Sequence, residues 1–433
     1  MPDPWPRSAR WTSAGLTVGG RAAADLADRF GTPLLVIDEA DMRQRMRAMT
    51  SAFPRVAYAV KAMTCAAVIR AALEEGLDLL CASGGEVATC LRAGAPASRV
   101  LLHGNAKTDD ELTAAVEASL GAVVVDDAQE LDRLGAIARG AGVAQAVLLR
   151  VTPDVAVETH EAIATGHAAS KFGVPLAAAA DVARRASATA GIRLIGLHAH
   201  AGSQVLDVDA HVRVVRALLG VAADAGIRPA IIDVGGGFGV TYTDETPSDV
   251  VAVAAALRDE LDANGSDAAL QIEPGRAIIA NPGLTLYRVL ARKQAGGRNL
   301  VAIDGGMSDN LRPALYDARH DVAAVSNGNG PTEQVTVVGR HCESGDVVAD
   351  DVSLPAGLPR GDLLAVAATG AYTYPLASAY NRFGRPAVVG VRDGEATLWV
   401  RREDVDDMDR LDVILGTPWG AGALPTAEGG ART

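Results

Sequence analysis

Short apolar runs alternate with alanine-rich amphipathic stretches between about residue 55 and residue 276. The runs are Val56–Val60, Leu77–Leu80, Val100–Leu102, Val123–Val125, Val147–Leu149, Leu194–Leu197, Ile231–Val234 and Leu270–Ile272. Buried parallel strands take this form, and each stretch between two runs is long enough for a helix. Eight such units predict an α/β protein built on a (β/α)8 TIM-like barrel rather than on an open sheet.

The pattern changes beyond about residue 284. Three runs there are strand-like, Glu333–Val338, Leu363–Ala367 and Ala387–Val391, and the turn at 392–395 (RDGE) is typical of a hairpin. We therefore predict a second, C-terminal β-rich domain. The predicted boundaries are an N-terminal segment at 1–34 that packs with the β domain, the barrel at 35–283, the β domain at 284–415 and a flexible tail at 416–433.

Composition narrows the class of protein. The chain has 433 residues, 49% of them hydrophobic and 21% charged, so it can bury a large core. Its net charge of −13 argues against nucleic acid or an anionic membrane as the main partner. The four cysteines, Cys65, Cys81, Cys90 and Cys342, form no CxxC pair, which is typical of reduced thiols. The sequence shows neither the apolar core of a signal peptide nor an apolar stretch long enough to span a membrane, so we expect a cytoplasmic protein.

Polar residues and glycines follow the apolar runs directly. Among them are Lys61, His198, the three glycines from Gly235 to Gly237, and Glu273. These positions lie at the C-terminal ends of the predicted strands, the face of a barrel where active sites form. Solvated loop starts would explain the polarity but not the choice of lysine, histidine, glycine and glutamate.

Lys61 directly follows a predicted strand. At the floor of a dry barrel mouth, burial would lower the pKa of its amine and favour Schiff-base chemistry. The alternative is a lysine at a strand end that reaches into solvent.

The segment 273–276 (EPGR) fixes a carboxylate and a guanidinium at another strand end. Such a pair suits a ligand with a cationic ring nitrogen and an anionic phosphate, as in pyridoxal phosphate, although it could also be an ion pair on a turn. The glycines Gly235 to Gly237 can bring backbone N–H groups close to a phosphate, or form a tight structural turn. Val240 stands where a dinucleotide fingerprint needs glycine, and no Gly-Lys-Ser/Thr follows, so neither NAD nor ATP is supported.

Three further motifs carry candidate chemistry. His198 and His200 could form a metal pair, but no carboxylate or cysteine cluster lies near them in sequence, so we predict no metal site. We favour one imidazole stacked on an aromatic ring, with Ser203 on a phosphate. Cys342 could return a proton to carbon as a general acid, or be a small buried hydrophobe. Arg312 could bind a substrate carboxylate.

Taken together, the motifs resemble those of the fold-type III pyridoxal-phosphate decarboxylases, and most closely the diaminopimelate decarboxylases. The resemblance runs from about residue 32 to residue 411. It rests on YAVKA at 58–62, SGGE at 83–86, HGNAK at 103–107, KFG at 171–173, HAHAGSQ at 198–204, DVGGGFG at 233–239, EPGR at 273–276, GGMSDNLRPALY at 305–316, CESGD at 342–346 and GAY at 370–372. It implies an alanine-racemase-type barrel that binds pyridoxal 5'-phosphate.

The resemblance also implies residue roles. Lys61 would carry the cofactor, Glu273 would pair with its ring nitrogen, and His200 would stack on the ring. The remaining cofactor site would consist of Ser203, Gly235, Gly236, Gly237, Gly275, Arg276 and Tyr372. Substrate would be bound by Arg276, Arg312, Tyr316, Glu343 and Tyr372. Cys342 would protonate the carbanion left when CO2 departs, and in a homodimer Cys342 and Glu343 would reach the partner's site.

The implied reaction is decarboxylation of meso-2,6-diaminopimelate to L-lysine. A paralogous decarboxylase for ornithine, lysine or a carrier-bound glutamyl group is the alternative. Arg312, Tyr316 and Glu343 favour diaminopimelate, because they provide for both a distal carboxylate and a distal ammonium. A racemase is disfavoured by Glu273, which makes the ring a strong electron sink, and a non-catalytic regulator by the presence of Lys61 and Cys342.

Overall fold

All eight predicted runs are strands of one closed parallel barrel. The computed structural model describes residues 3–415 apart from 154, 156–169, 248 and 327–329. The barrel strands, in spatial order, are β9 (Gln145–Thr152), β11 (Ile192–Ala199), β12 (Ile231–Asp233), β13 (Ala269–Ile272), β5 (Arg55–Ala59), β6 (Asp78–Cys81), β7 (Val100–Leu102) and β8 (Ala122–Val125). Pairing of β8 with β9 closes the ring, and β10 (Val174–Pro175) adds to β9.

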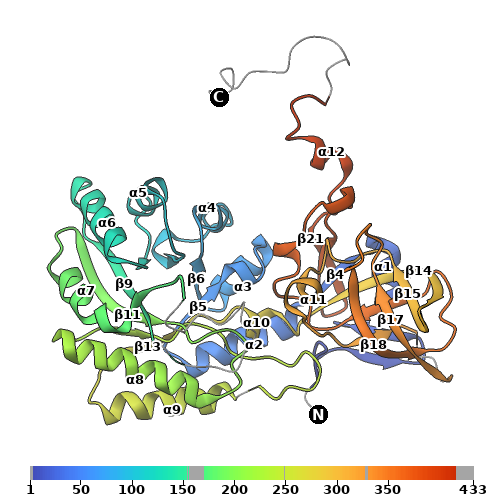
Figure 1. Cartoon of the computed structure of the whole chain (residues 1–433), viewed down its shortest axis with the longest axis horizontal. Helices are drawn as coiled ribbons and strands as arrows, with labels where there is room; N and C mark the ends of the chain where they lie inside the picture. Colours follow the sequence, from blue (N-terminus) through green and yellow to red (C-terminus); the bar gives the residue numbers. More distant parts are fainter. Residues whose placement is uncertain (1–2, 154, 156–169, 248, 327–329, 416–433) are drawn as a thin grey trace.

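Helices surround the barrel (Figure 1). They are α2 (Glu39–Ala52), α3 (Ala66–Glu74), α4 (Gly84–Arg92), α5 (Asp109–Glu117), α6 (Ala128–Gly140), α7 (Leu176–Ala188), α8 (Val208–Ala225) and α9 (Val250–Ala263). Several polar residues after the strands are helix caps: the side chains of Ser83 and Asp127 accept hydrogen bonds from the first turns of α4 and α6. Capping thus accounts for part of the polarity at this barrel face.

Two apolar layers hold the barrel together. Its interior is filled by small and medium side chains such as Ala57, Ala122, Val124 and Leu148. Between strands and helices lies a larger cluster that includes the fully buried Tyr58 and Ile69. Burial on both faces explains why the strands read as continuous apolar runs instead of alternating ones.

A second sheet, which forms the β-rich part of the protein, lies beside the barrel, on the right in Figure 1. Its spatial order is β18 (Val347–Pro355), β17 (Thr332–Val338), β15 (Arg298–Ile303), β14 (Gly283–Ala295), β4 (Leu34–Asp38), β20 (Ala387–Arg392) and β21 (Glu395–Val400), with β19 (Leu363–Val366) on β14 and β16 (Val322–Ala324) on β19. The predicted hairpin is confirmed: Arg392 pairs with Glu395, and Asp393 and Gly394 both have positive φ.

The chain enters the second sheet before it builds the barrel. Strand β4 pairs with β14 on one side and with β20 on the other, so it lies in the middle of the second sheet. The preceding segment, with β1 (Arg10–Thr12), β2 (Gly15–Val18), β3 (Arg21–Ala22) and α1 (Ala23–Phe30), packs there too. The Trp5 Nε1–H donates to Asp321 at 2.9 Å and the Leu16 N–H to Val325 O at 2.8 Å.

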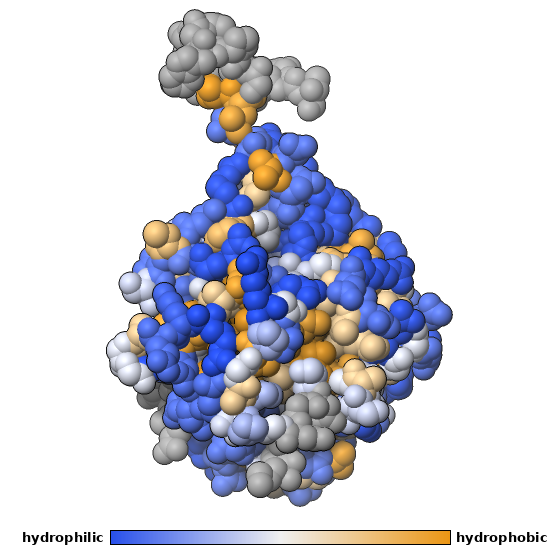
Figure 2. Space-filling model, turned by 90° about the vertical axis from the view of Figure 1, so that its right-hand side faces the viewer, coloured by the Kyte–Doolittle hydropathy of each residue, from blue (hydrophilic) through white to orange (hydrophobic). Residues whose placement is uncertain are grey.

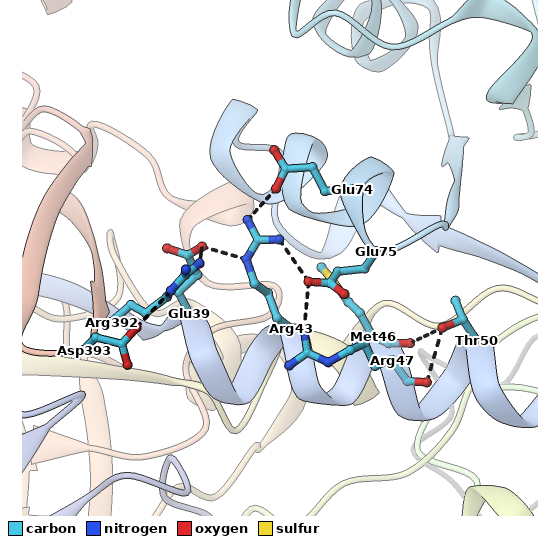
Figure 3. Close-up of polar contacts among 9 residues, drawn as sticks. All are labelled: Glu39, Arg43, Met46, Arg47, Thr50, Glu74, Glu75, Arg392 and Asp393. Carbon is cyan, nitrogen blue, oxygen red and sulfur yellow. Dashed lines mark hydrogen bonds and ion pairs between the residues drawn. The ribbon is translucent and has the colours of Figure 1, made fainter.

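An ion-pair network joins the two parts (Figure 3). Arg43 on α2 contacts Glu39, Glu74 and Glu75, at 2.7, 2.7 and 3.1 Å. The Glu39 carboxylate also accepts from Arg392 of β20, at 3.1 Å. Helix α2 is thereby linked both to the end of α3 and to the second sheet.

The last described segment extends from the body. Helix α12 (Val405–Asp409) projects upward in Figure 1, and Leu411, Val413 and Leu415 beyond it are exposed. Figure 2 shows a largely hydrophilic face with hydrophobic side chains at this projecting end. The tail predicted at 416–433 lies outside the described residues. No helix within the described ranges is long and apolar enough to cross a membrane.

Candidate active site

Lys61 lies in a 3-10 turn, Val60–Ala62, directly after barrel strand β5. Its side chain is exposed, so the burial expected from the sequence is absent. Two neighbours hold the turn: the Tyr372 N–H donates to Ala62 O at 2.9 Å, and the Ala59 N–H to Pro274 O at 3.1 Å. The turn that carries Lys61 is therefore held between the segment 273–276 and a loop of the second domain, with the lysine side chain free to project from it.

The candidate phosphate-binding residues come together beside this turn. Arg276 donates through Nη2 to Ser203 Oγ at 2.8 Å, and its guanidinium lies 4.9 Å from the ring centre of Tyr372. The glycine segment 235–237 touches the same group, since the Val205 N–H donates to Gly237 O at 2.8 Å. Gly237 has φ +87°, and a Cβ there would lie 2.0 Å from Gly202 O. Only glycine permits this approach.

His200 lies next to the glycine segment. A Cβ at Gly235 would be 2.7 Å from His200 Nδ1, so the imidazole packs directly on the backbone there. Gly275 is equally close to the lysine turn, because its Cβ would meet Ala62 Cβ at 2.9 Å. The four motifs that contain Lys61, His200, Gly236 and Glu273 thus form one continuous surface at the C-terminal ends of the strands.

Glu273 lies at the centre of this group of motifs, and its side chain is buried. Burial raises the pKa of Glu273 to about 7 and that of neighbouring Asp233 to about 8. Oxygen Oε2 of Glu273 lies 3.2 Å from His198 Nε2. The other oxygen, Oε1, is buried and has no fixed hydrogen-bond donor among the described residues, although the Asp233 carboxyl can hydrogen-bond with Glu273 when one of the two is protonated. A buried acceptor in this state calls for a donor from a bound group.

His103 and His198 lie next to Oε2 of the Glu273 carboxylate. Their Nε2 atoms are 3.3 Å apart, and with Glu273 they offer three atoms that a metal ion could bind. Burial lowers the pKa of His198 to about 4 and that of His103 well below its usual range. The charges of Arg150, Lys107 and Lys61 also act on His103, and this positive surrounding disfavours a cation. We read the cluster as a support for Glu273.

A second guanidinium stands beside Arg276. Arg312 opens the short helix α11 (Arg312–Tyr316) of the second domain and is 6% exposed. Its Nη1 donates to Tyr242 Oη at 2.8 Å, while its buried Nε has no partner in the described part of the chain. No ion pair of Arg276 or Arg312 with a carboxylate occurs among the described residues. Tyr316, half-buried, is near enough to interact electrostatically with both arginines.

Cys342 and Glu343 lie apart, on an exposed loop between β17 and β18. The Cys342 N–H donates to Asn381 Oδ1 at 2.7 Å, and the Tyr380 hydroxyl donates to Glu343 at 3.3 Å. Both partners belong to a 3-10 turn of the same domain, Tyr380–Arg382, so the loop is held within its own domain, and its side chains are exposed.

Sequence reasoning missed Tyr242. It follows the glycine segment by five positions, and nothing in its surroundings in the chain sets it apart from a core tyrosine. The hydroxyl that contacts two arginines becomes recognisable only when β12, β13 and α11 are brought together. Arg150, inside β9, also acts on the site, because its charge limits the rise in the pKa of Glu273 that burial causes.

Comparison with known proteins matches this geometry. Residues 39–280 match the family model described as pyridoxal-dependent decarboxylase, pyridoxal binding domain. A diaminopimelate decarboxylase of Actinosynnema pretiosum subsp. auranticum is 48% identical over 94% of this chain and 95% of its own length. That of Bacillus subtilis is 40% identical over 93% and 96%. The chain belongs to the diaminopimelate decarboxylase family of pyridoxal-dependent enzymes.

Solved structures extend the match to the whole fold. The diaminopimelate decarboxylase of M. jannaschii, in complex with L-lysine, has a TM-score of 0.89 at 29% identity, covering 94% of this chain and 98% of its own. A lysine/ornithine decarboxylase of Vibrio vulnificus has a TM-score of 0.75 at 26% identity, covering 86% and 97%. The predictions of an alanine-racemase-type barrel, a β-rich second domain and pyridoxal phosphate as cofactor are confirmed for this diaminopimelate decarboxylase family member.

Proposed function

We propose that the chain decarboxylates meso-2,6-diaminopimelate to L-lysine and CO2. The observation that carries this proposal is the buried pair Arg276 and Arg312, which has no carboxylate partner among the described residues. Two buried guanidiniums need two anions. Arg276 bonds Ser203 on the phosphate side, which leaves Arg312 for a carboxylate at the far end of the substrate. Ornithine and lysine have no second carboxylate to offer.

The residues at the barrel mouth fit pyridoxal phosphate. The unpartnered Oε1 of Glu273 would accept from the ring nitrogen, and the surface formed by Ser203, Gly235, Gly236, Gly237, Gly275, Arg276 and Tyr372 would hold the phosphate. His200 would lie against the ring. When bound, the cofactor supplies an electron sink for the carbon that loses CO2.

The protein side chains divide the remaining work. Lys61, exposed at the mouth, would hold the cofactor through its amine. Glu273 would hold a carboxyl oxygen at the ring nitrogen; burial raises its pKa to about 7, and Asp233, Arg150 and Lys61 limit that rise. Arg312 and Tyr316 orient the distal carboxylate, with Arg276 and Tyr372 beside them. Cys342 delivers the proton to the carbon, and Glu343 binds the distal ammonium.

We further propose a homodimer in which Cys342 and Glu343 act in the partner's site. Their exposure on an outward-facing loop supports this arrangement. Mixing K61A and C342A, each inactive alone, under conditions of subunit exchange should restore about a quarter of wild-type activity, because half the dimers then hold one intact site. No recovery despite demonstrated exchange would contradict the shared site.

Substrate identity is tested by steady-state kinetics. We expect kcat/KM for meso-diaminopimelate to exceed that for L-ornithine and L-lysine by at least about a hundredfold, since each of these has a single carboxylate and, when that carboxylate is the reacting one, leaves none at the far end for Arg312. Preference for ornithine would overturn the proposal.

Cofactor attachment has its own test: K61A should lose the visible absorbance of the lysine-bound cofactor. We place the enzyme in the cytoplasm, in line with the buried Cys81 and Cys90 thiols, whose sulfurs are 3.5 Å apart and hydrogen-bonded rather than joined as a disulfide.

A further inference from the structure

Two buried arginines share one tyrosine oxygen. Arg276 opens the short helix α10 (Arg276–Ile279) after β13, and Arg312 opens α11 of the second domain. Each donates through Nη1 to the Oη of Tyr242. The tyrosine ring also lies under both guanidiniums, with its centre 5.7 Å from Arg276 and 4.7 Å from Arg312. Tyr242 itself is 5% exposed.

Like charges at this separation repel one another, and burial removes the water that would screen them. Burial lowers the pKa of Arg312, and the charge of Arg276 adds to this effect. A phenol oxygen has two lone pairs, so it can accept from both arginines at once, while the electron-rich ring face favours each cation. Tyr242 is therefore the group that allows the two arginines to stand side by side.

The tyrosine is held from the other side. Its ring meets His320 edge-on, at a centroid distance of 5.2 Å and an angle of 89°. His320 bonds through Nδ1 to Ala367 O at 2.9 Å, and burial lowers its pKa to about 3, so it remains neutral. Tyr242 thus has a fixed place between the barrel and the second sheet.

With one Nη of each arginine fixed, the remaining donors have set directions. Arg276 uses Nη2 on Ser203 Oγ, at the phosphate side. Arg312 keeps its buried Nε unpartnered within the described structure. The two anion-binding groups therefore differ in direction but share a single support.

We propose that Tyr242 is a positioning residue that sets Arg312 for the distal carboxylate of the substrate and Arg276 for the cofactor phosphate, and so couples the two binding events. This inference rests on the proposed function, because the distal carboxylate is that of the proposed substrate. Loss of the hydroxyl alone weakens both anion contacts and leaves the rest of the substrate's contacts in place.

The test is Tyr242→Phe, which keeps the ring and removes the oxygen. Two competitive inhibitors separate the contact with Arg312 from the other substrate contacts. L-lysine, the product, can bind with its carboxylate at the far end, beside Arg312, and cadaverine is the same chain without that carboxylate. We expect the inhibition constant of L-lysine and the KM of meso-diaminopimelate to rise about tenfold to thirtyfold, with kcat and the inhibition constant of cadaverine changed by about twofold at most. The dissociation constant of pyridoxal phosphate from the cofactor-free protein, followed by fluorescence quenching, should rise about fivefold.

Tyr374→Phe is the matched control, because Tyr374 is a half-buried tyrosine of the second domain outside the arginine pair. It should leave all five constants unchanged. Should Y242F fail to fold, Tyr242→Gln keeps a polar side chain that ends short of both guanidiniums, and the same pattern is expected. Equal weakening of L-lysine and cadaverine, or unchanged L-lysine and cofactor binding, would overturn the role of Tyr242. A wild-type enzyme inactive on diaminopimelate would instead overturn the proposed function, and the cofactor constant would still report on Tyr242.

Discussion

At the scale of single residues, the chemistry depends on buried groups that lack a partner. Glu273 and Arg312 each bury a polar atom that no described residue satisfies, one an acceptor and the other a donor. Such atoms are costly in a folded protein, and they persist where a ligand completes them. They mark the two ends of the proposed ligands, the ring nitrogen of the cofactor and the far carboxylate of the substrate.

The buried carboxyl of Glu273 makes cofactor-free stability depend on pH. Because its pKa is raised from 4.5 to about 7, the stabilisation is fully present below pH 4.5 and is lost as the pH rises through 7. Relative to E273Q, the wild type should lose about 3 kcal/mol of unfolding free energy between pH 4.5 and pH 8. Urea unfolding of both cofactor-free proteins at several pH values measures this difference.

A matched control is Glu260→Gln. Glu260 is a surface carboxylate whose pKa is lowered by Arg216, so its substitution should show no trend above pH 5. Parallel curves for the wild type and E273Q would contradict the assignment of Glu273 as a buried acid.

Asn381 should position Cys342. Its side-chain oxygen accepts from the Cys342 N–H, and its own backbone is left-handed, with φ 51°. Asp keeps both the acceptor and the tolerance for this conformation, Gly keeps only the conformation, and Ala keeps neither. We expect N381D to retain kcat, and N381G and N381A to lose about 1 kcal/mol of transition-state stabilisation, or roughly fivefold in kcat, with KM unchanged.

Comparing the three Asn381 variants separates the side chain from the backbone. If N381G matched the wild type while N381A did not, the hydrogen bond would be irrelevant and only the left-handed backbone would matter. If all three matched the wild type, the Cys342 loop would not depend on Asn381.

At the scale of elements, α2 is the link between barrel and sheet. Arg43 contacts three carboxylates, and the shared Glu39 reaches Arg392 on β20. Networks of this kind stabilise more than isolated surface pairs, and salt screens them. R43M should lower the unfolding free energy by about 1 kcal/mol at low salt and by less at 1 M NaCl. Arg401→Met, which removes the pair between an exposed arginine and the half-buried Asp407, should have a smaller effect.

Elements whose partners are near in the chain were predictable, and those with distant partners were not. The eight barrel strands follow from local apolar runs, since each pairs with its neighbours along the chain, apart from the last strand, β13, which also pairs with the first, β5. Leu34–Asp38 has the same apolar character, but only its pairing with β14 and β20 places it in the second sheet. The division into domains at 34, 283 and 415 remains a prediction.

The candidate site shows the same limit. Strand-end positions brought Lys61, His200 and Glu273 together in advance, because parallel strands end at one face. The support that Tyr242 gives to Arg276 and Arg312 depends on contacts among three separate loops, which no spacing records. The exposure of Lys61 was also missed, because the sequence does not show how wide the barrel mouth is.

At the scale of the whole molecule, the exposed apolar end suggests where a second subunit binds. Leu411 is 84% and Val413 71% exposed on the projecting segment after α12. We expect L411D/V413D to weaken the proposed dimer, because two charges replace apolar contact area. Sedimentation velocity should show a shift toward monomer, and specific activity should fall on dilution. A double variant that stays dimeric and fully active would place the interface elsewhere.

The central position of β4 also has a consequence during synthesis. Leu34–Asp38 leaves the ribosome early, whereas the strands on its two sides, Gly283–Ala295 and Ala387–Arg392, are translated long afterwards. At roughly 5–20 residues per second, this apolar segment waits for tens of seconds without its neighbours. The barrel can close in the meantime, so the nascent chain then contains a folded barrel preceded, on its N-terminal side, by an unpaired hydrophobic strand. That strand is where a chaperone would bind, and where aggregation would begin if none did.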